Sequence, residues 1–123
     1  MYSVEADTSK RLLVISAAGH ASAAEVKELA QRVREVVADF SPGFKALTDF
    51  RWLDSMDTSA APFMAEVMDA LAAKKVATVV RVVPDPRKDI GLNILSRFRY
   101  GSSTRVVTYE TLADALQEIA AQG

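Results

Sequence analysis

From residue 10 onward, short apolar runs of strand length alternate with segments of helical periodicity, and this alternation most constrains the fold. The clearest strand signal is the β-branched run at residues 76–83. The clearest helix follows a Ser22–Glu25 capping box and ends near Ser41-Pro42-Gly43. Alternating strands and helices form largely parallel sheets with right-handed crossovers. The pattern therefore predicts an α/β fold.

A hairpin precedes this alternation, because residues 2–7 and 10–18 are separated by the turn signal Thr8-Ser9. Gly19-His20-Ala21 is expected to break the second strand. Further strands are predicted at residues 44–51, 76–83 and 104–109. Further helices are predicted from a cap near Ser59 to Lys75, over residues 89–100 with Ile90, Ile94, Leu95 and Phe98 as apolar face, and from Thr111. The order β-β-α-β-α-β-α-β-α predicts one domain over residues 1–123, with a mixed, mostly parallel sheet covered by helices.

Composition excludes several classes of protein. Half of the 123 residues are hydrophobic and a quarter are charged, as in ordinary globular domains. The chain has no cysteine, which excludes disulfides and thiolate metal sites. A formal net charge of −1 gives no global attraction to nucleic acid, so no nucleic-acid partner is expected. No secretion signal or membrane-spanning run is visible, and we expect a cytoplasmic protein.

One segment carries a recognisable motif. Asp49 and Asp57 lie eight residues apart, and Met56-Asp57-Thr58-Ser59 begins the next helical segment. This segment resembles the signature of the STAS domain, in which a strand ends in Asp-Leu-Ser and Asp-Ser-Ser-Gly follows at a helix start. STAS domains form bacterial anti-sigma factor antagonists and the cytoplasmic tails of sulphate transporters. The order of elements is also similar to STAS over nearly the whole chain.

The resemblance implies a non-enzymatic, bacterial regulatory domain that binds a protein partner. It places Thr58 at the family's phosphoacceptor, with Ser59 as the neighbouring hydroxyl. An anti-sigma factor or kinase-type regulator would phosphorylate Thr58 and release the domain. Asp57 would orient the hydroxyl, and Asp49 would support the loop. The family's glycine is Ala60 here, a feature similar to STAS-like proteins of unassigned role.

Each of these residues also has a structural interpretation. Thr58 and Ser59 are good helix N-caps. Asp49 is typical of a strand end, and Asp57 is typical of a turn. The residues around them match no recognisable cation-binding loop, so no metal and no cofactor are expected. His20, the single histidine, is either a surface turn residue or a catalytic base. Nucleophile-elbow and phosphate-loop motifs are missing, which favours a protein that is not an enzyme.

Three further residues are candidate contacts for a partner or ligand. Trp52 follows the predicted third strand, and Trp is prominent in interfaces. Arg97 and Arg99 lie in residues 81–105, which hold six basic and two acidic residues and favour an acidic protein over nucleic acid. An alternative hypothesis is a small-ligand or lipid-binding domain, whose apolar pocket these three residues border. A homodimer through an exposed edge strand is a further expectation.

Overall fold

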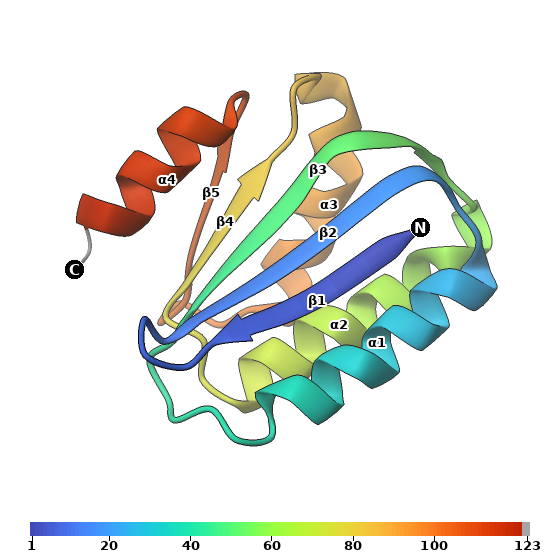
Figure 1. Ribbon diagram of the computed structural model, residues 1–123. Helices are drawn as coiled ribbons and strands as arrows, with labels where there is room; N and C mark the ends of the chain where they lie inside the picture. The colour runs from blue at the N-terminus through green and yellow to red at the C-terminus, as the bar shows by residue number, and fades with distance from the viewer. Residues whose placement is uncertain (122–123) are drawn as a thin grey trace.

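The computed structural model describes residues 1–121, in which strands and helices alternate in the predicted order (Figure 1). The elements are β1 (Tyr2–Asp7), β2 (Leu12–Ala21), α1 (Ala23–Val37), β3 (Lys45–Met56), the 3₁₀ helix η1 (Thr58–Ala60), α2 (Ala61–Ala73), β4 (Thr78–Val82), α3 (Pro86–Arg99), β5 (Arg105–Tyr109) and α4 (Leu112–Ala121). The prediction of an α/β fold with a mixed, mostly parallel sheet is confirmed.

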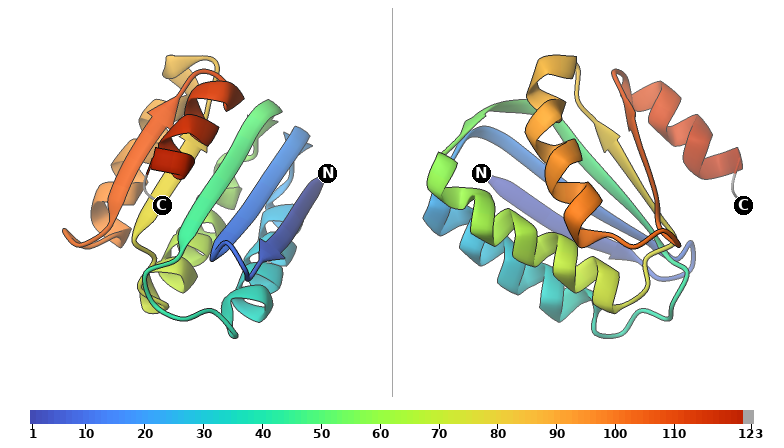
Figure 2. Two further views of the ribbon diagram at one scale, coloured as in Figure 1. Left: turned by 60° about the vertical axis from the view of Figure 1, so that its left-hand side comes forward. Right: turned by 180° about the vertical axis from the view of Figure 1, so that it is seen from behind.

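The sheet has the strand order β1-β2-β3-β4-β5, with β1 antiparallel to β2 and every later pair parallel. Each new parallel strand is added on the same side of the last one. Right-handed crossovers therefore place α1, α2 and α3 on one face of the sheet. Figure 2 shows these three helices together on one face of the sheet, behind it in the left view and in front of it in the right view, while α4, which follows the last strand, covers the other face.

Two hydrophobic cores correspond to these two faces. The larger core lies between the sheet and α1, α2 and α3, and includes the fully buried Leu13, Phe44 and Leu71. The smaller core lies under α4 and consists of Leu47, Val80, Val82 and Ala115. The inner strand β4, between β3 and β5, is buried along its whole length.

The predicted capping box at the start of α1 is confirmed. The backbone amide of Glu25 donates to Ser22 Oγ at 3.1 Å, and the amide of Ser22 donates to Glu25 Oε1 at 3.4 Å. Glu25 also pairs with the chain's N-terminal ammonium group at 2.7 Å.

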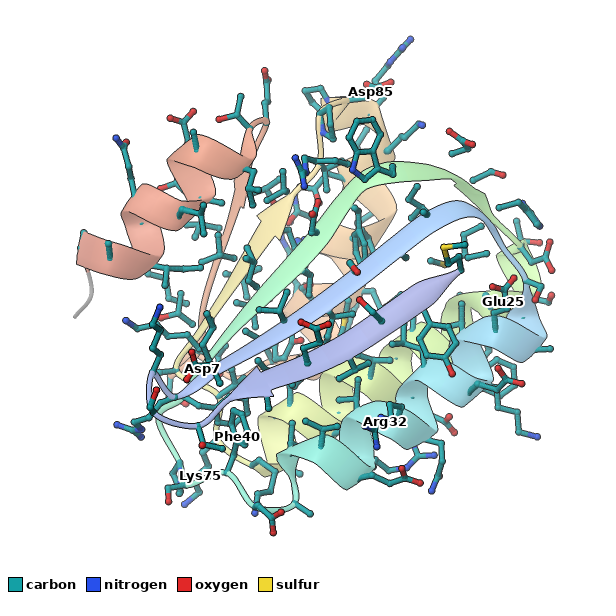
Figure 3. The ribbon with its side chains drawn as sticks, in the orientation of Figure 1. Asp7, Glu25, Arg32, Phe40, Lys75 and Asp85 are labelled. Atoms are coloured by element: carbon teal, nitrogen blue, oxygen red, sulfur yellow. The ribbon has the colours of Figure 1, made fainter. Side chains whose placement is uncertain are left out.

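Figure 3 places Glu25 and Asp85 near the edge where the parallel strands end, and Phe40 and Lys75 at the opposite edge. In open α/β sheets, ligands bind at the edge where parallel strands end.

Two strands run further toward this edge than predicted. Gly19 and His20 do not break β2, which continues to Ala21, while β3 continues to Met56. The pairing of β2 with β3 shifts register twice, so β3 accommodates two extra residues. Gly19 has a φ of +70°, which a glycine adopts without strain. Bulges and a glycine thus carry both strands past the expected break.

The predicted orientation of α3 is wrong. Of its expected apolar face, Leu95 is half-buried and packs against the larger core, but Ile90, Ile94 and Phe98 are 59%, 52% and 82% exposed. The helix also begins earlier than predicted, at Pro86, after Asp85 caps it by accepting from the amide of Arg87 at 3.0 Å. Proline suits the first turn of a helix because its missing amide proton would have no partner there.

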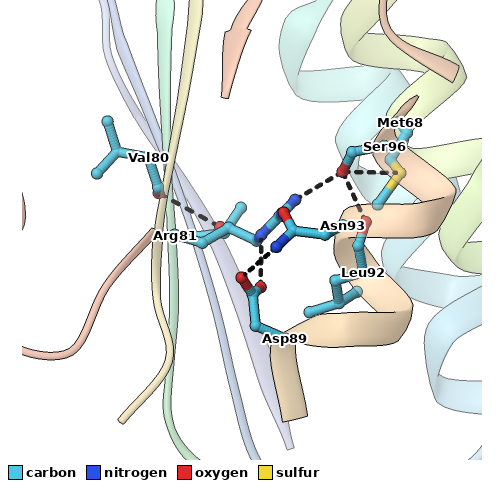
Figure 4. A network of polar contacts seen from close by, with 8 residues as sticks. Met68, Val80, Arg81, Asp89, Leu92, Asn93 and Ser96 are labelled. Atoms are coloured by element: carbon cyan, nitrogen blue, oxygen red, sulfur yellow. Dashed lines mark hydrogen bonds and ion pairs between the residues drawn. The ribbon is translucent and has the colours of Figure 1, made fainter. Parts of the chain in front are cut away.

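A buried arginine explains this orientation (Figure 4). Arg81 on β4 is 2% exposed, and its guanidinium donates to Asp89 at 3.1 Å, to Ser96 at 2.7 Å and to Asn93 at 2.6 Å. Asn93 in turn donates to the second oxygen of Asp89 at 2.9 Å. Because a buried cation must be paired, Asp89, Asn93 and Ser96 of α3 turn toward Arg81, and three of the five large apolar residues of this helix face outward.

Candidate functional site

Thr58 and Ser59 lie where β3 passes into α2, and both side chains are exposed. Neither hydroxyl makes a hydrogen bond within residues 1–121, so the interpretation of either residue as a side-chain cap is wrong. The segment enters α2 through the turn η1, where the amide of Ala60 donates to the carbonyl of Asp57 at 2.9 Å. Pro62 then occupies the first turn of α2. The two hydroxyls are therefore open to solvent.

Asp57 anchors this segment to two other elements. Its Oδ2 accepts from the backbone amide of Ala23, at the start of α1, at 3.1 Å. Its Oδ1 lies 2.7 Å from Nε2 of His20 on β2. The amide of Ala23, and after it the ring of His20, lower the pKa of the Asp57 carboxyl below its usual value. Because these partners hold both oxygens, Asp57 positions the loop rather than orienting the Thr58 hydroxyl.

His20 belongs to the site, and its place within a strand corrects the expectation of a turn histidine. Its Nδ1 lies 2.6 Å from the hydroxyl oxygen of Ser55 on β3. Since a carboxylate can only accept, Nε2 donates to Asp57, and Nδ1 of the neutral ring accepts from Ser55. The His20 side chain is 54% exposed, so this serine–histidine pair is open to solvent and is not enclosed in a deep cleft. The hydrogen bonds of His20 to Ser55 and Asp57 hold the ends of β2 and β3 together.

An apolar hollow of about 330 Å³ adjoins Thr58. It is lined by Leu53, Asp54, Ser55, Met56, Asp57, Thr58, Ala61, Met64, Lys88, Gly91, Leu92 and Leu95. Lys88 Nζ reaches across from α3 and donates to the backbone carbonyls of Leu53 and Asp54, at 3.4 and 3.2 Å. We call this space the site hollow. It lies between the end of β3, the start of α2 and the outer part of α3.

Asp49 and Trp52 belong to a separate cluster within β3. Asp49 lies inside the strand and accepts from Nε and Nη2 of Arg51, each at 2.9 Å, so it does not support the Thr58 loop. Hydrogen bonding to Arg51 lowers the pKa of the Asp49 carboxyl. Trp52 is 67% exposed, and the Arg51 guanidinium lies 5.6 Å from the centre of its ring. The pair forms a preorganised aromatic surface away from the site hollow.

The basic candidates near the end of α3 have different surroundings. Arg99 pairs with Asp69 of α2 at 3.3 Å. Arg97 is exposed and lines another hollow, together with Tyr100 and Thr104. Neither arginine lines the site hollow, and Trp52 does not either, so the expected border of the apolar pocket is wrong. Lys88 is the cation at the site hollow, and no sequence signal distinguished it from the other basic residues.

Residues 1–121 contain neither a candidate metal cluster nor a candidate membrane span. No group of three or more His, Asp or Glu side chains in this part of the chain could hold a metal ion. None of the helices formed by these residues combines the length and the apolar character needed to cross a membrane.

Comparisons with known proteins place this geometry in a structural class. No protein-family model matches the sequence, and curated proteins give no significant match. Among solved structures, the chain is similar to an uncharacterised Shewanella loihica protein of the DUF3478 family with a SpoIIAA-like fold. The TM-score is 0.71 at 18% identity, over 97% of this chain and 92% of that one.

Two anti-sigma factor antagonists are also similar. For SpoIIAA in its unphosphorylated form, the TM-score is 0.67 at 16% identity, over 98% of each chain. For an antagonist from Mycobacterium paratuberculosis, the TM-score is 0.62 at 24% identity, over 98% of this chain and 93% of that one. Similarity at these identities, over nearly whole chains, establishes the arrangement of the elements. The chain therefore has the SpoIIAA-like fold of STAS domains.

Proposed function

We propose that this chain is a non-enzymatic regulatory domain that binds a protein partner through the surface around Thr58 and is switched by phosphorylation of that residue. The observation that carries the proposal is the exposed Thr58 hydroxyl, which has no hydrogen-bond partner within residues 1–121 and lies on a loop anchored by Asp57. A kinase needs a free hydroxyl on an accessible segment. SpoIIAA, which shares the fold, has been solved in unphosphorylated and phosphorylated forms.

The electrostatics of the loop support a switch. A phosphate adds about −1.5 to −2 charges at neutral pH. On Thr58 it would lie beside the carboxylates of Asp57 and Asp54 and on the rim of the site hollow. A partner docked there would meet this charge directly, and an acidic partner surface would be repelled. Binding is then lost without unfolding, as expected of a partner such as an anti-sigma factor or kinase-type regulator.

Capture of partners from the native host tests the proposal. Tagged wild-type protein and the variants Thr58→Ala and Thr58→Glu are compared in a pull-down, and phosphosites are mapped on the recovered protein. Thr58→Ala removes a hydroxyl that bonds to nothing within residues 1–121, so it is expected to fold and to retain the partner. Thr58→Glu is expected to lose it. Ser59→Glu, one residue further from Asp57, is the matched control. Equal capture by both Thr58 variants contradicts the switch.

A second candidate function is the binding of a small ligand or lipid in the site hollow. The observation that favours it is the apolar wall formed by Leu53, Met64 and Leu95, with the Lys88 ammonium at the mouth for an anionic group. Native mass spectrometry of the purified protein would then show an added mass. Leu95→Trp, which narrows the hollow, should remove the added mass, whereas Leu116→Trp on α4 should keep it.

A further inference from the structure

Three large apolar side chains lie on the outward side of α3. Ile90, Ile94 and Phe98 follow one another at four-residue steps, so they form one row along the helix. They are 59%, 52% and 82% exposed. Single exposed apolar residues are ordinary on protein surfaces, whereas a continuous apolar patch marks an interaction site. We call these three residues the outer row.

Helix α3 itself contributes only basic side chains to the surface beside the outer row, and two of them pair with acidic residues of neighbouring segments, Arg87 with Asp85 and Arg99 with Asp69. All four basic residues of α3 are exposed: Arg87, Lys88, Arg97 and Arg99. The only acidic residue of α3, Asp89, is buried against Arg81 and presents no charge to the surface. Arg97 makes no ion pair or hydrogen bond within residues 1–121 and is available to a partner. The electrostatic complement of this helix face is an acidic surface.

The outer row is continuous with the site hollow. Gly91 and Leu95 each follow a member of the row by one position, so they lie one step further round the helix. Both also line the site hollow. The row and the hollow form a single apolar tract, which runs from the outer face of α3 to the start of α2. The convex row faces outward, and the concave hollow has room for a protruding side chain.

We propose that this tract is the docking surface for an amphipathic, acidic helix of a protein partner. The apolar side of that helix lies along the outer row, one of its apolar side chains enters the site hollow, and its acidic residues face Arg97. The inference rests on the proposed function, because it takes the occupant to be a protein, and it adds the chemistry by which that protein is recognised.

Other occupants fit the charges less well. Two copies of this chain packed through α3 would bring the same exposed cations together, and like charges across an interface repel. A broad anionic membrane surface would meet the exposed carboxylates of Asp54 and Asp69, which flank the tract. A single helix, about 10 Å wide, follows the outer row and avoids both.

Peptide binding to the full chain tests the proposal. The probe is a synthetic helical peptide of about 18 residues with Leu on one face and Glu on the other. The same peptide with Lys in place of Glu is its charge-reversed control. Fluorescence anisotropy at low salt measures both. We expect the Glu peptide to bind at least about tenfold more tightly than the Lys peptide.

Variants locate the binding surface. The double variant Ile94→Ser/Phe98→Ser is expected to weaken binding of the Glu peptide about tenfold, since it removes two apolar anchors. Arg97→Glu should weaken it severalfold and reduce its salt dependence. Leu116→Ser, which changes an exposed leucine on α4, is the matched control and should bind as wild type does. Circular dichroism checks that each variant is folded.

The proposal is overturned if the two peptides bind alike, or if the double variant binds the Glu peptide as wild type does. Binding to phosphatidylglycerol vesicles without binding to the Glu peptide would assign a membrane instead. A dimer in sedimentation that Phe98→Ser dissolves would assign a second copy. The Thr58 pull-down uses neither the peptide nor the outer row. Failure of the peptide test alone therefore removes this inference and leaves the proposed function standing.

Discussion

The buried Arg81–Asp89 pair provides the most quantitative test of how this fold is held together. Arg81 is 2% exposed and Asp89 is 5% exposed, and the guanidinium and carboxylate are 3.1 Å apart. Arg81→Met keeps an unbranched side chain of similar length and leaves the Asp89 carboxylate with one remaining donor, Asn93. Removing one partner of a buried pair costs about 3–5 kcal/mol. For a chain of this size the melting temperature should fall by about 12–20 °C.

A double-mutant cycle isolates the pair. Asp89→Asn alone leaves the arginine without its buried anion, so it should be similarly unstable. Arg81→Met/Asp89→Asn contains neither buried charge and should be more stable than Arg81→Met by about 2 kcal/mol or more. Urea unfolding followed by circular dichroism gives the four free energies of unfolding. Arg87→Met, which removes an exposed partner of Asp85, is the matched control and should unfold at nearly the same urea concentration as wild type.

The reasoning is refuted if Arg81→Met lies within about 1 kcal/mol of wild type at pH 7, or if the two single effects simply add.

Two further predictions concern the backbone and the Thr58 loop. Gly43 has a φ of +88°, so Gly43→Ala should lower the free energy of unfolding in urea by about 1–2 kcal/mol. Gly91 lies within α3, so Gly91→Ala should raise the free energy of unfolding by about 0.5–1 kcal/mol. Asp57→Ala should destabilise at pH 7 by removing the partner of Ala23. Because the pKa of Asp57 is lowered in the fold, the difference from wild type should be full above about pH 5 and disappear as pH falls below about 4; a pH-independent difference in melting temperature would contradict this.

Local patterns predicted much of this structure. Alternating apolar runs fixed the order of the elements, because a strand or an amphipathic helix must bury one face wherever it lies. The Ser22 capping box was predictable because its hydrogen bonds join residues three apart. The position of Thr58 and Ser59 at the start of a helical segment was inferred from a local motif. In each case the determining contacts lie close together in the sequence.

The parts that were not predicted depend on distant residues. His20 is brought to Ser55 and Asp57 by the pairing of β2 with β3, and two shifts in register decide which side chains meet. Nothing near His20 in the sequence records that pairing. Asp49 was expected near the end of its strand. Because β3 continues to Met56, Asp49 lies inside the strand instead, where it pairs with the nearby Arg51.

Helix α3 shows how one distant residue reverses a local pattern. The positions of its apolar residues predict which side of the helix packs on the sheet. That prediction holds only if the sheet surface beneath the helix is apolar. Arg81 changes that surface, and Asp89 and Ser96 turn inward to satisfy it. A buried ion pair gives little net stability compared with apolar packing, and an exposed Phe98 gains none from burial. Stability therefore explains neither feature, whereas the proposed docking of a partner helix on the outer row would account for the exposure of Phe98.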